Sequence, residues 1–413
     1  MIFPHRPTRR ELLLGSGALF AWAYAPRVPL AEGRDPRFLV VVLRGALDGL
    51  ATVAPVGDPD WERLRGSSAL TLVGPTPALP LDSFFALNPA MPNLHRLYKA
   101  GQATIIHAVA TPYRERSHFD GQDVLESGLI RPGFVGSGWL NRALFGLPAA
   151  GRVNPKQAFA VGPIAPLVAR GPAPILVWTP SRLPPASNDT MSRLLDLYRH
   201  TDPALARVLE ERSALSVIAQ TSGMNEASMK GPKTTGVPGA ALSAYFAESA
   251  SAAAKFMARP DGPRVGALAF DGWDTHANEG AATGRLAVLL AALDGAINAI
   301  EADLGEAWHE SVIAVVTEFG RTAHINGTEG TDHGTATVAL LIGGALKGGR
   351  LISDWPGLSE ANLYEGRDLK PTTDLRSVLK GILKDHLLAD ERFLTKDVFP
   401  GSQGVRPLAG LVA

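Results

Sequence analysis

The chain has 413 residues, and its 40 Lys and Arg balance its 40 Asp and Glu, so the formal net charge is zero. Hydrophobic residues make up 46% and charged residues 19%, which is typical of a globular protein and excludes a disordered charged chain or a protein built mainly to bind nucleic-acid phosphates. Cysteine is absent, so disulfides and thiolate ligands are excluded, and any metal must be held by His, Asp, Glu or hydroxyl groups.

The N-terminal segment resembles a bacterial twin-arginine export signal. Thr8-Arg9-Arg10-Glu11-Leu12-Leu13 matches the pattern of that motif, and the apolar stretch after it, residues 12–25, is shorter than the ~20 residues that span a bilayer. The alternative is a short helix that begins with two arginines. We expect residues 1–31 to be a signal peptide read by the twin-arginine machinery. The mature chain is then periplasmic or secreted, with no transmembrane segment.

Apolar runs alternate with helical patterns along the rest of the chain. Continuous runs rich in Val, Ile, Leu and Phe are typical of strands buried on both faces, and they predict strands at residues 38–43, 103–109, 158–161, 175–178, 265–270, 312–317 and 338–342. Helices are expected at residues 191–220, 240–257, 285–304 (with Thr283 as N-cap) and 373–388. This alternation predicts an α/β fold, a doubly wound and mostly parallel sheet with helices on both faces.

The expected domain organisation is one domain over residues 32–413. Two Ala- and Ser-rich helical segments within about residues 185–260 lack neighbouring strand patterns. We therefore expect a helical cap or an insertion there, with a loop at residues 223–239 that is rich in Gly, Thr, Lys and Pro.

Polar clusters follow four of the predicted strands. In open α/β sheets, ligands bind outside the carboxyl ends of the strands, so these clusters are candidates for one shared site. Carboxylate oxygen and imidazole nitrogen without sulfur suit Zn, Mn, Mg, Ca or Fe. The side chains in question are Arg44, Asp48, Arg116, Ser117, His118, Asp274, His276, Glu318, Arg321, Asp332 and His333.

The motifs in these clusters resemble those of one family. The strings LRGALDGL, SHFDGQDVLESG, GWLNR, DGWDTH, TEFGRT and GTDHG resemble the family called domain of unknown function 1501, over residues from about 37 to about 388. That family looks like a branch of the alkaline phosphatase, sulfatase and phosphoglycerate mutase superfamily. The resemblance implies an alkaline phosphatase-like fold and one or two divalent metal ions. It also implies attack on phosphate or sulfate esters by a Ser, a Thr or a modified Cys.

The resemblance also implies roles for individual residues. Asp48 matches a ligand of one metal, the alternative being a turn or a helix N-cap. Asp274 and His276 match the pair that binds the other metal, the alternative being a hydrogen-bonded pair within the loop. Their spacing is Asp-x-His rather than the usual Asp-x-x-x-His, so both side chains reach one point only if the segment is a loop. Glu318 takes the place of an Asp ligand, or else pairs with Arg321. The resemblance further implies that His333 is a ligand and that Asp332 is a ligand or the partner that orients one.

Ser117 stands where the superfamily has its nucleophile, which a divalent ion would activate by lowering the pKa of the hydroxyl. The alternative is that Ser117 caps a helix over residues 118–126. His118 is either a further donor to the same centre or a packed loop residue, and His107, inside a predicted strand, is expected in the core. Arg44, Arg116 and Arg321 are expected to hold the anionic oxygens of the substrate.

The leading functional prediction is a metal-dependent periplasmic hydrolase of phosphate or sulfate esters, acting on a small-molecule or glycan ester. One alternative is transfer of a phospho group to envelope glycans. The other is a non-catalytic exported envelope protein with the same fold, which the changed Asp-x-His spacing and the Glu at position 318 favour. No nucleic-acid partner is expected, because the chain has no surplus of basic residues.

Overall fold

The computed structural model describes residues 34–133, 135–147, 158–162, 164–178 and 239–413, with isolated positions between 195 and 206. The signal peptide predicted at residues 1–31 lies outside the described residues, as do the helix predicted at 191–220 and most of the cap predicted at about 185–260. Residues Pro36–Ala413 form one unit by their internal contacts. No helix in the described part of the chain is both long and apolar enough to cross a membrane.

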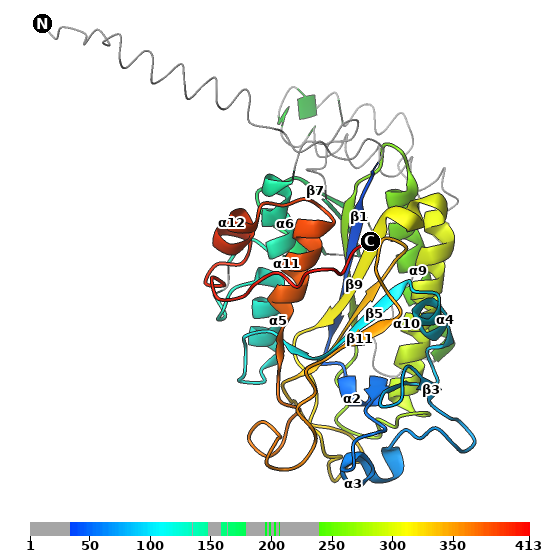
Figure 1. Cartoon of the computed structure of the whole chain (residues 1–413). Coiled ribbons are helices and arrows are strands. Elements are labelled where there is room, and N and C mark those ends of the chain that lie inside the picture. Colours follow the sequence, from blue (N-terminus) through cyan, green and yellow to red (C-terminus); the bar gives the residue numbers. More distant parts are fainter. Residues whose placement is uncertain are drawn as a thin grey trace, which may run out of the picture. The chain divides into compact units, whose positions relative to one another are not determined.

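A nine-stranded sheet runs through this unit (Figure 1). The lateral order is β11-β5-β10-β9-β1-β8-β6-β7, and β12 also pairs with β5. Each of the seven predicted strands is present, with ends that differ by at most one residue. The strands of this sheet are β1 (Arg37–Arg44), β5 (Ala103–Ala110), β6 (Ala158–Val161), β7 (Ile175–Trp178), β8 (Val265–Asp271), β9 (Ser311–Thr317), β10 (Thr337–Ile342), β11 (Arg350–Ile352) and β12 (Thr373–Asp374).

Strand β10 is the exception to an otherwise parallel sheet. It pairs antiparallel with both β5 and β9, whereas the remaining pairings are parallel. A parallel neighbour needs a crossover connection, usually a helix, and residues 318–336 between β9 and β10 contain none. The chain therefore turns back at the edge where β9 ends. The predicted mostly parallel sheet is confirmed, and the reversal of β10 is an addition to it.

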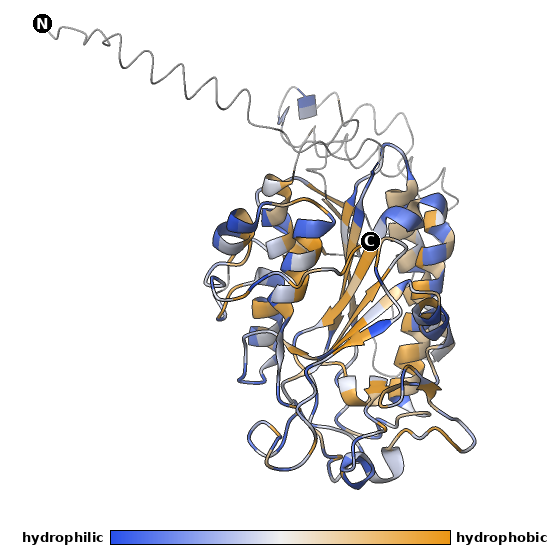
Figure 2. Ribbon diagram, in the orientation of Figure 1, coloured by the Kyte–Doolittle hydropathy of each residue, from blue (hydrophilic) through white to orange (hydrophobic). Residues whose placement is uncertain are grey.

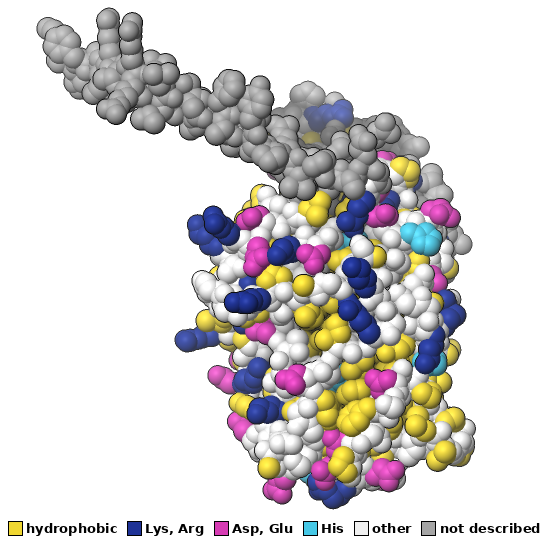
Figure 3. Space-filling model, in the orientation of Figure 1, with side chains coloured by type: hydrophobic (Ala, Val, Ile, Leu, Met, Phe, Trp, Pro, Cys, Tyr) yellow, Lys and Arg dark blue, Asp and Glu magenta, His cyan; other side chains and the backbone are white. Residues whose placement is uncertain are grey.

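Helices cover both faces of the sheet, as predicted. Along β1, Leu39, Val41 and Leu43 belong to one buried apolar cluster, while alternate residues such as Val40 belong to another. The first cluster packs against α4 (Pro92–Lys99), α9 (Gly239–Ala258) and α10 (Arg285–Leu304), and the second against α5 (His118–Ser127), α6 (Trp139–Ala143) and α11 (Leu375–Asp385). Figure 2 shows the resulting apolar interior, and Figure 3 shows acidic and basic side chains interspersed over one face.

Helix α10 has the predicted bounds, but its N-cap and the start of α11 differ from the predictions. The N-cap of α10 is Gly284, not Thr283, because the chain at Gly284 adopts φ 96°, a left-handed conformation that favours glycine. Helix α11 begins at Leu375, two residues after the predicted start. The two preceding residues pair with β5 as strand β12, and the side chain of Asp374 caps the helix by accepting a hydrogen bond from the backbone N–H of Arg376.

Short elements complete the fold. The ones that bear on the site follow β1: α2 (Gly49–Thr52), α3 (Trp61–Arg65), and a small sheet of β2 (Val53–Ala54), β4 (Ala86–Leu87) and β3 (Leu79–Pro80). The others are η1 (Gly66–Ser68), η2 (Leu144–Gly146), η3 (Leu167–Ala169), η4 (Gly305–Glu310), α12 (Glu391–Phe393) and the π-helical turn η5 (Leu394–Val398).

Candidate metal-binding site

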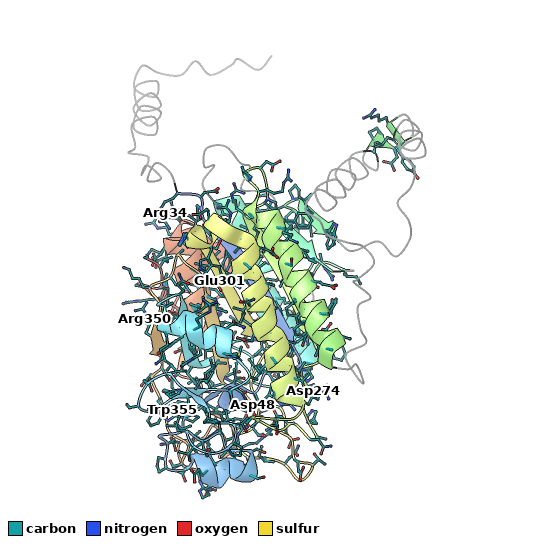
Figure 4. The ribbon with its side chains drawn as sticks, turned by 90° about the vertical axis from the view of Figure 1, so that its right-hand side faces the viewer. Arg34, Asp48, Asp274, Glu301, Arg350 and Trp355 are labelled. Carbon is teal, nitrogen blue, oxygen red and sulfur yellow. The ribbon has the colours of Figure 1, made fainter. Side chains whose placement is uncertain are left out.

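The predicted site residues lie at one edge of the sheet. The parallel strands β1, β5, β8 and β9 all end there, and the reversed strand β10 begins there. Figure 4 shows Asp48 and Asp274 toward the same end of the sheet, away from Glu301 at the far end of α10. Loops that are distant in sequence therefore meet at this edge.

Three side chains form the centre of the site. His118, Asp274 and His333 each offer one donor atom, and these atoms lie within 4.8 Å of one another. The Asp274 carboxylate lies 3.5 Å from His118 Nε2 and 3.5 Å from His333 Nε2. His276 joins the edge of the group, with its Nε2 at 3.0 Å from Asp274 Oδ1 and 2.9 Å from His333 Nε2. We call these four residues the donor group.

The chemistry of the donor group fits a divalent cation. Ligands at about 2.0–2.1 Å from a tetrahedral zinc ion are about 3.3 Å from one another. Here the contacts of the three imidazoles with Asp274 and of His276 with His333 run from 2.9 to 3.5 Å. His118 Nε2 is buried and makes no hydrogen bond within the described residues. An unpartnered buried nitrogen costs free energy, and imidazole nitrogen with carboxylate oxygen is a donor set for Zn, Mn or Fe.

Glu318 orients His118 from behind. His118 is the first residue of α5, and its Nδ1 lies 2.9 Å from Oε1 of Glu318. A proton on Nδ1 leaves the Nε2 lone pair of His118 directed toward Asp274, another member of the donor group. Glu318 is fully buried and also accepts hydrogen bonds from the backbone N–H of Gly45 and the Thr317 hydroxyl, both at 2.8 Å. Both carboxylate oxygens of Glu318 therefore have hydrogen-bond partners within the chain. That Glu318 is a direct metal ligand stays a prediction.

The two pKa values of this pair move in opposite directions. Burial alone would raise the pKa of Glu318, but hydrogen bonds from His118 and its other donors hold it below its usual range. Burial would lower the pKa of His118, but the nearby carboxylates of Asp274 and Glu318 outweigh it and raise the pKa to about 9. Without a cation, His118 therefore carries a proton at neutral pH.

The carbonyl oxygen of Arg116 orients His333 in the same manner. His333 Nδ1 donates to Arg116 O at 2.8 Å, so its Nε2 faces the donor group. Arg116 has φ 62°, an uncommon value for a residue with a side chain and one that clusters at functional sites. Its guanidinium contacts Glu365 and Asp368, at 2.6 and 2.8 Å.

Asp274 and His276 converge in spite of their changed spacing. The segment after β8 is a loop, as their convergence requires, and it lets both side chains reach the same point. Buried Arg321 donates to Asp274 Oδ1 at 2.7 Å. Burial would raise the pKa of Asp274, but its contacts with His118, His333 and Arg321 hold it far below its usual range.

The outer side of His276 contacts Asp332. Asp332 Oδ1 lies 3.3 Å from His276 Nδ1, on the far side of the ring from the donor group. Of the two roles predicted for Asp332, this position corresponds to orienting a ligand. Asn326 Nδ2 donates to both Asp332 Oδ1 and the His276 carbonyl, at 3.2 and 3.0 Å, and so ties the two loops together.

Asp48 lies outside the donor group. Its carboxylate is 1% exposed, forms an ion pair with Arg65 Nη1, and accepts from Arg65 Nη2 at 3.1 Å. It also caps α2 by accepting from the backbone N–H of Ala51 at 3.0 Å. As a metal ligand Asp48 stays a prediction, and the structure places it in a buried ion pair.

The three residues predicted to be catalytic occupy different settings. Arg44 pairs with buried Glu126 at 2.6 Å, and Arg321 holds Asp274. Ser117 is the residue directly before His118 and occupies the N-cap position of α5, but its side chain makes no capping hydrogen bond. Its backbone N–H donates to the Tyr113 hydroxyl at 3.2 Å. Both guanidiniums thus have carboxylate partners within the protein.

Sequence reasoning left the role of His118 open and missed Arg65 and Glu279. The signal for His118 was its place beside Ser117, in the polar cluster that follows strand β5. Glu279 is 1% exposed and accepts from the hydroxyls of Thr275 and Thr331, at 2.9 and 2.7 Å. Thr331 Oγ1 in turn accepts from Arg321 Nε at 3.0 Å, so Glu279 supports Asp274 through two intermediaries. No spacing in the sequence indicates this chain of contacts.

Comparison with known proteins gives one family and several distant structures. The profile of the family described as "Protein of unknown function (DUF1501)" matches residues 97–392. No curated protein matches the chain. Among solved structures, the chain is similar to the periplasmic domain of EcEptC from Escherichia coli in complex with Zn, at 11% identity over 76% of this chain and 74% of that chain, with a TM-score of 0.36.

Two further structures are similar at the same level. A phosphonate monoester hydrolase of Agrobacterium radiobacter is 12% identical over 77% of this chain and 70% of that chain, with a TM-score of 0.35. Ps i-CgsB, in complex with k-i-k-neocarrahexaose, is 12% identical over 78% and 69%, with a TM-score of 0.36. Likeness at these identities and TM-scores does not determine function.

Proposed function

The chain belongs to the DUF1501 family of proteins of unknown function, and from that premise we propose that it is an exported, metal-dependent hydrolase of phosphate or sulfate esters with Ser117 as its nucleophile. One observation carries the proposal: donor atoms of His118, Asp274 and His333 converge within 4.8 Å, and the residue directly before His118 is a serine. Ser117 is therefore next in the chain to His118, a member of the donor group, at the N-terminal end of α5.

The residues around the donor group have positioning roles in this proposal. A divalent ion, when bound, supplies the positive charge that lowers the pKa of a nearby hydroxyl and stabilises charge on the transferred group. His118, Asp274 and His333 would hold it, with His276 at the rim. Glu318 and the Arg116 carbonyl each keep a proton on Nδ1 of one imidazole, which directs the other nitrogen inward. Arg321 fixes the Asp274 carboxylate.

We propose that Ser117 acts on an anionic ester. Its hydroxyl makes no capping hydrogen bond to the helix. Helix α5 has 10 residues, and the positive end of its dipole favours an anionic group at the position of Ser117. In the proposed reaction the hydroxyl oxygen gives up its proton and bonds to the phosphorus or sulfur atom, while the ester bond to the alcohol breaks and the alcohol leaves with a proton. Water then attacks the same atom, which breaks its bond to Ser117, restores the hydroxyl and releases phosphate or sulfate.

The first experiment measures metal content and turnover together. Elemental analysis of the purified protein, before and after chelation, would be combined with assays on aryl phosphate and aryl sulfate. We expect His333→Ala to lose both metal and activity. Ser117→Ala should keep the metal and lose at least about 100-fold in rate. His309→Ala and Ser359→Ala are matched controls outside the site. Full activity in Ser117→Ala would contradict the assigned nucleophile.

A second candidate is a non-catalytic, metal-binding exported protein. The observation that favours it is that Arg44, Arg321 and the carboxylate of Asp48 all have partners within the chain. Bound metal without turnover on any ester would support this candidate. Phospho-group transfer, the remaining alternative, would appear as a phosphorylated product when an alcohol acceptor is added to the assay.

A further inference from the structure

A cavity lies at the same edge of the sheet as the donor group. Its volume is about 320 Å³, and its walls are residues 67–71, 73, 75 and 76, which include the end of η1, and residues 280–283, just before α10. Binding sites for small molecules begin at about 300 Å³. None of the residues that line the cavity is charged. Nothing in the proposed hydrolysis uses this cavity.

The lining of the cavity is rich in hydroxyl groups. Ser67, Ser68, Thr71, Thr76 and Thr283 all contribute to it. Thr71 donates to a carbonyl of its own loop at 2.7 Å, whereas the other four hydroxyls make no side-chain hydrogen bond within the described residues. A hydroxyl both donates and accepts a hydrogen bond, so the lining suits a ligand that carries hydroxyls itself.

Buried side chains hold both walls in place. Asn88, which is fully buried, donates to the Ala281 carbonyl of one wall and to the Ala51 carbonyl of α2, both at 2.9 Å. Buried Trp61 donates from Nε1 to the Leu70 carbonyl of the other wall at 3.0 Å. The cavity is therefore formed before any ligand arrives, which lowers the entropic cost of binding.

The cavity and the donor group share their supporting loops. The loop between β8 and α10 carries Asp274 and His276 first and the wall at residues 280–283 afterwards. Glu279, next to that wall, accepts from the hydroxyls of Thr275 and Thr331 beneath the donor group. On the other side, Ser67 follows Arg65, the partner of Asp48, by two residues.

We propose that this cavity binds a neutral sugar unit. A ring with several hydroxyls matches uncharged donors and acceptors, whereas a charged ligand would be desolvated there without a counter-charge. Resting on the proposed function, we infer that the sugar is the glycan part of an ester whose anionic group reaches the donor group. The substrate class is then a phosphorylated or sulfated glycan rather than a simple aryl ester.

Calorimetric titration of chelated protein with maltose and with chitobiose tests this inference. We expect binding of at least one sugar and a loss of at least about tenfold in affinity in Thr76→Trp, which places an indole in the cavity. Leu72→Trp is the matched control, because Leu72 is 48% exposed on the same loop and does not line the cavity. It should bind as the parent does.

Three results would overturn the inference: no binding of either sugar, unchanged binding in Thr76→Trp, or equal binding of glucuronic acid, which is charged. If Thr76→Trp fails to fold, Thr283→Val and Ser68→Ala remove hydroxyls instead and should each weaken binding. Because the titration needs neither metal nor turnover, sugar binding can fail while hydrolysis holds, and hydrolysis can fail while sugar binding holds.

Discussion

Two aspartates at the same edge of the sheet have opposite surroundings. Asp48 is 1% exposed, and both of its oxygens face the guanidinium of Arg65. Asp274 is half-buried and has one guanidinium contact, from Arg321, while three imidazoles crowd the same carboxylate. The first setting is neutralised by the chain itself. In the second setting, nitrogen atoms of three imidazoles lie close to the oxygen atoms of one carboxylate.

The difference between the two settings indicates where we propose that this protein binds a cation. A buried charge without a partner is costly, and a partner within the chain removes that cost. Around Asp48 the chain supplies the partner. Around Asp274 it supplies a nitrogen, His118 Nε2, that is buried with no hydrogen bond among the described residues. The same residue types thus serve folding in one place and form a candidate metal-binding site in the other.

The largest expected effect is on stability, at Asp48. Arg65→Met leaves this buried carboxylate unpaired, and we expect the free energy of unfolding to fall by about 3–5 kcal/mol. Arg63→Met, on the same helix, removes an exposed pair with Asp60 and should cost about 1 kcal/mol or less. Urea denaturation measures both. Equal losses would mean that the Asp48 pair contributes no more than a surface pair.

A second prediction concerns the buried imidazole of His107. Both ring nitrogens of His107 have backbone partners, and burial lowers the pKa of this imidazole from 6.5 to about 4. The unfolded chain therefore takes up the proton first as pH falls. Stability is full above pH 6.5 and falls by up to about 3 kcal/mol on acidification to pH 4.

Urea denaturation at pH 7 and at pH 4.5, for the parent and His107→Asn, checks this. The variant should lose less stability between the two pH values than the parent does. An identical loss in both proteins would show that other groups carry the acid sensitivity.

Metal addition tests the donor group directly. Free zinc at 100 times its Kd should stabilise the parent by about 2.7 kcal/mol, because the ion binds only the folded protein. His118→Ala should lose most of this gain, whereas His309→Ala should keep it. Thermal unfolding of chelated protein, with and without added zinc, measures the effect. A gain of the same size in His118→Ala would exclude His118 as a ligand.

The smallest expected effect is a difference in metal affinity between variants of the two orienting carboxylates, Glu318 and Asp332. Glu318→Gln weakens the buried contact behind His118, and we expect metal affinity to fall by about 10- to 100-fold. Asp332→Asn alters a contact that is half exposed on both sides, so its effect should be smaller. Competition with a zinc chelator ranks the two variants. The reverse order would place the dominant support on the His276 side.

The sheet and the meeting of the loops were predictable for a physical reason. Continuous apolar runs encode strands buried on both faces, and parallel strands bring their carboxyl ends to one edge. That reasoning correctly brought Asp274, His276 and His333 together. The direction of β10 was not predictable, because an apolar run carries no sign of which way the strand points.

The ion pair of Asp48 was not predictable either. Arg65 lies 17 residues from Asp48 in the sequence, on a short helix. An arginine there is expected at the surface, because arginine side chains are mostly exposed in folded proteins. His118 was ambiguous because the position after a helix N-cap suits packing as well as coordination. Contacts of this kind depend on how loops pack, which spacing alone does not report.

The reversal of β10 has a consequence for how such a site can change. Because β9 and β10 are neighbours that run in opposite directions, residues 318–336 leave and re-enter the sheet at adjacent positions. This one insert supplies Glu318, Arg321 and His333 together. Because all three side chains come from one connection, a change in the length of that connection would displace them together relative to His118 on α5 and Asp274 after β8.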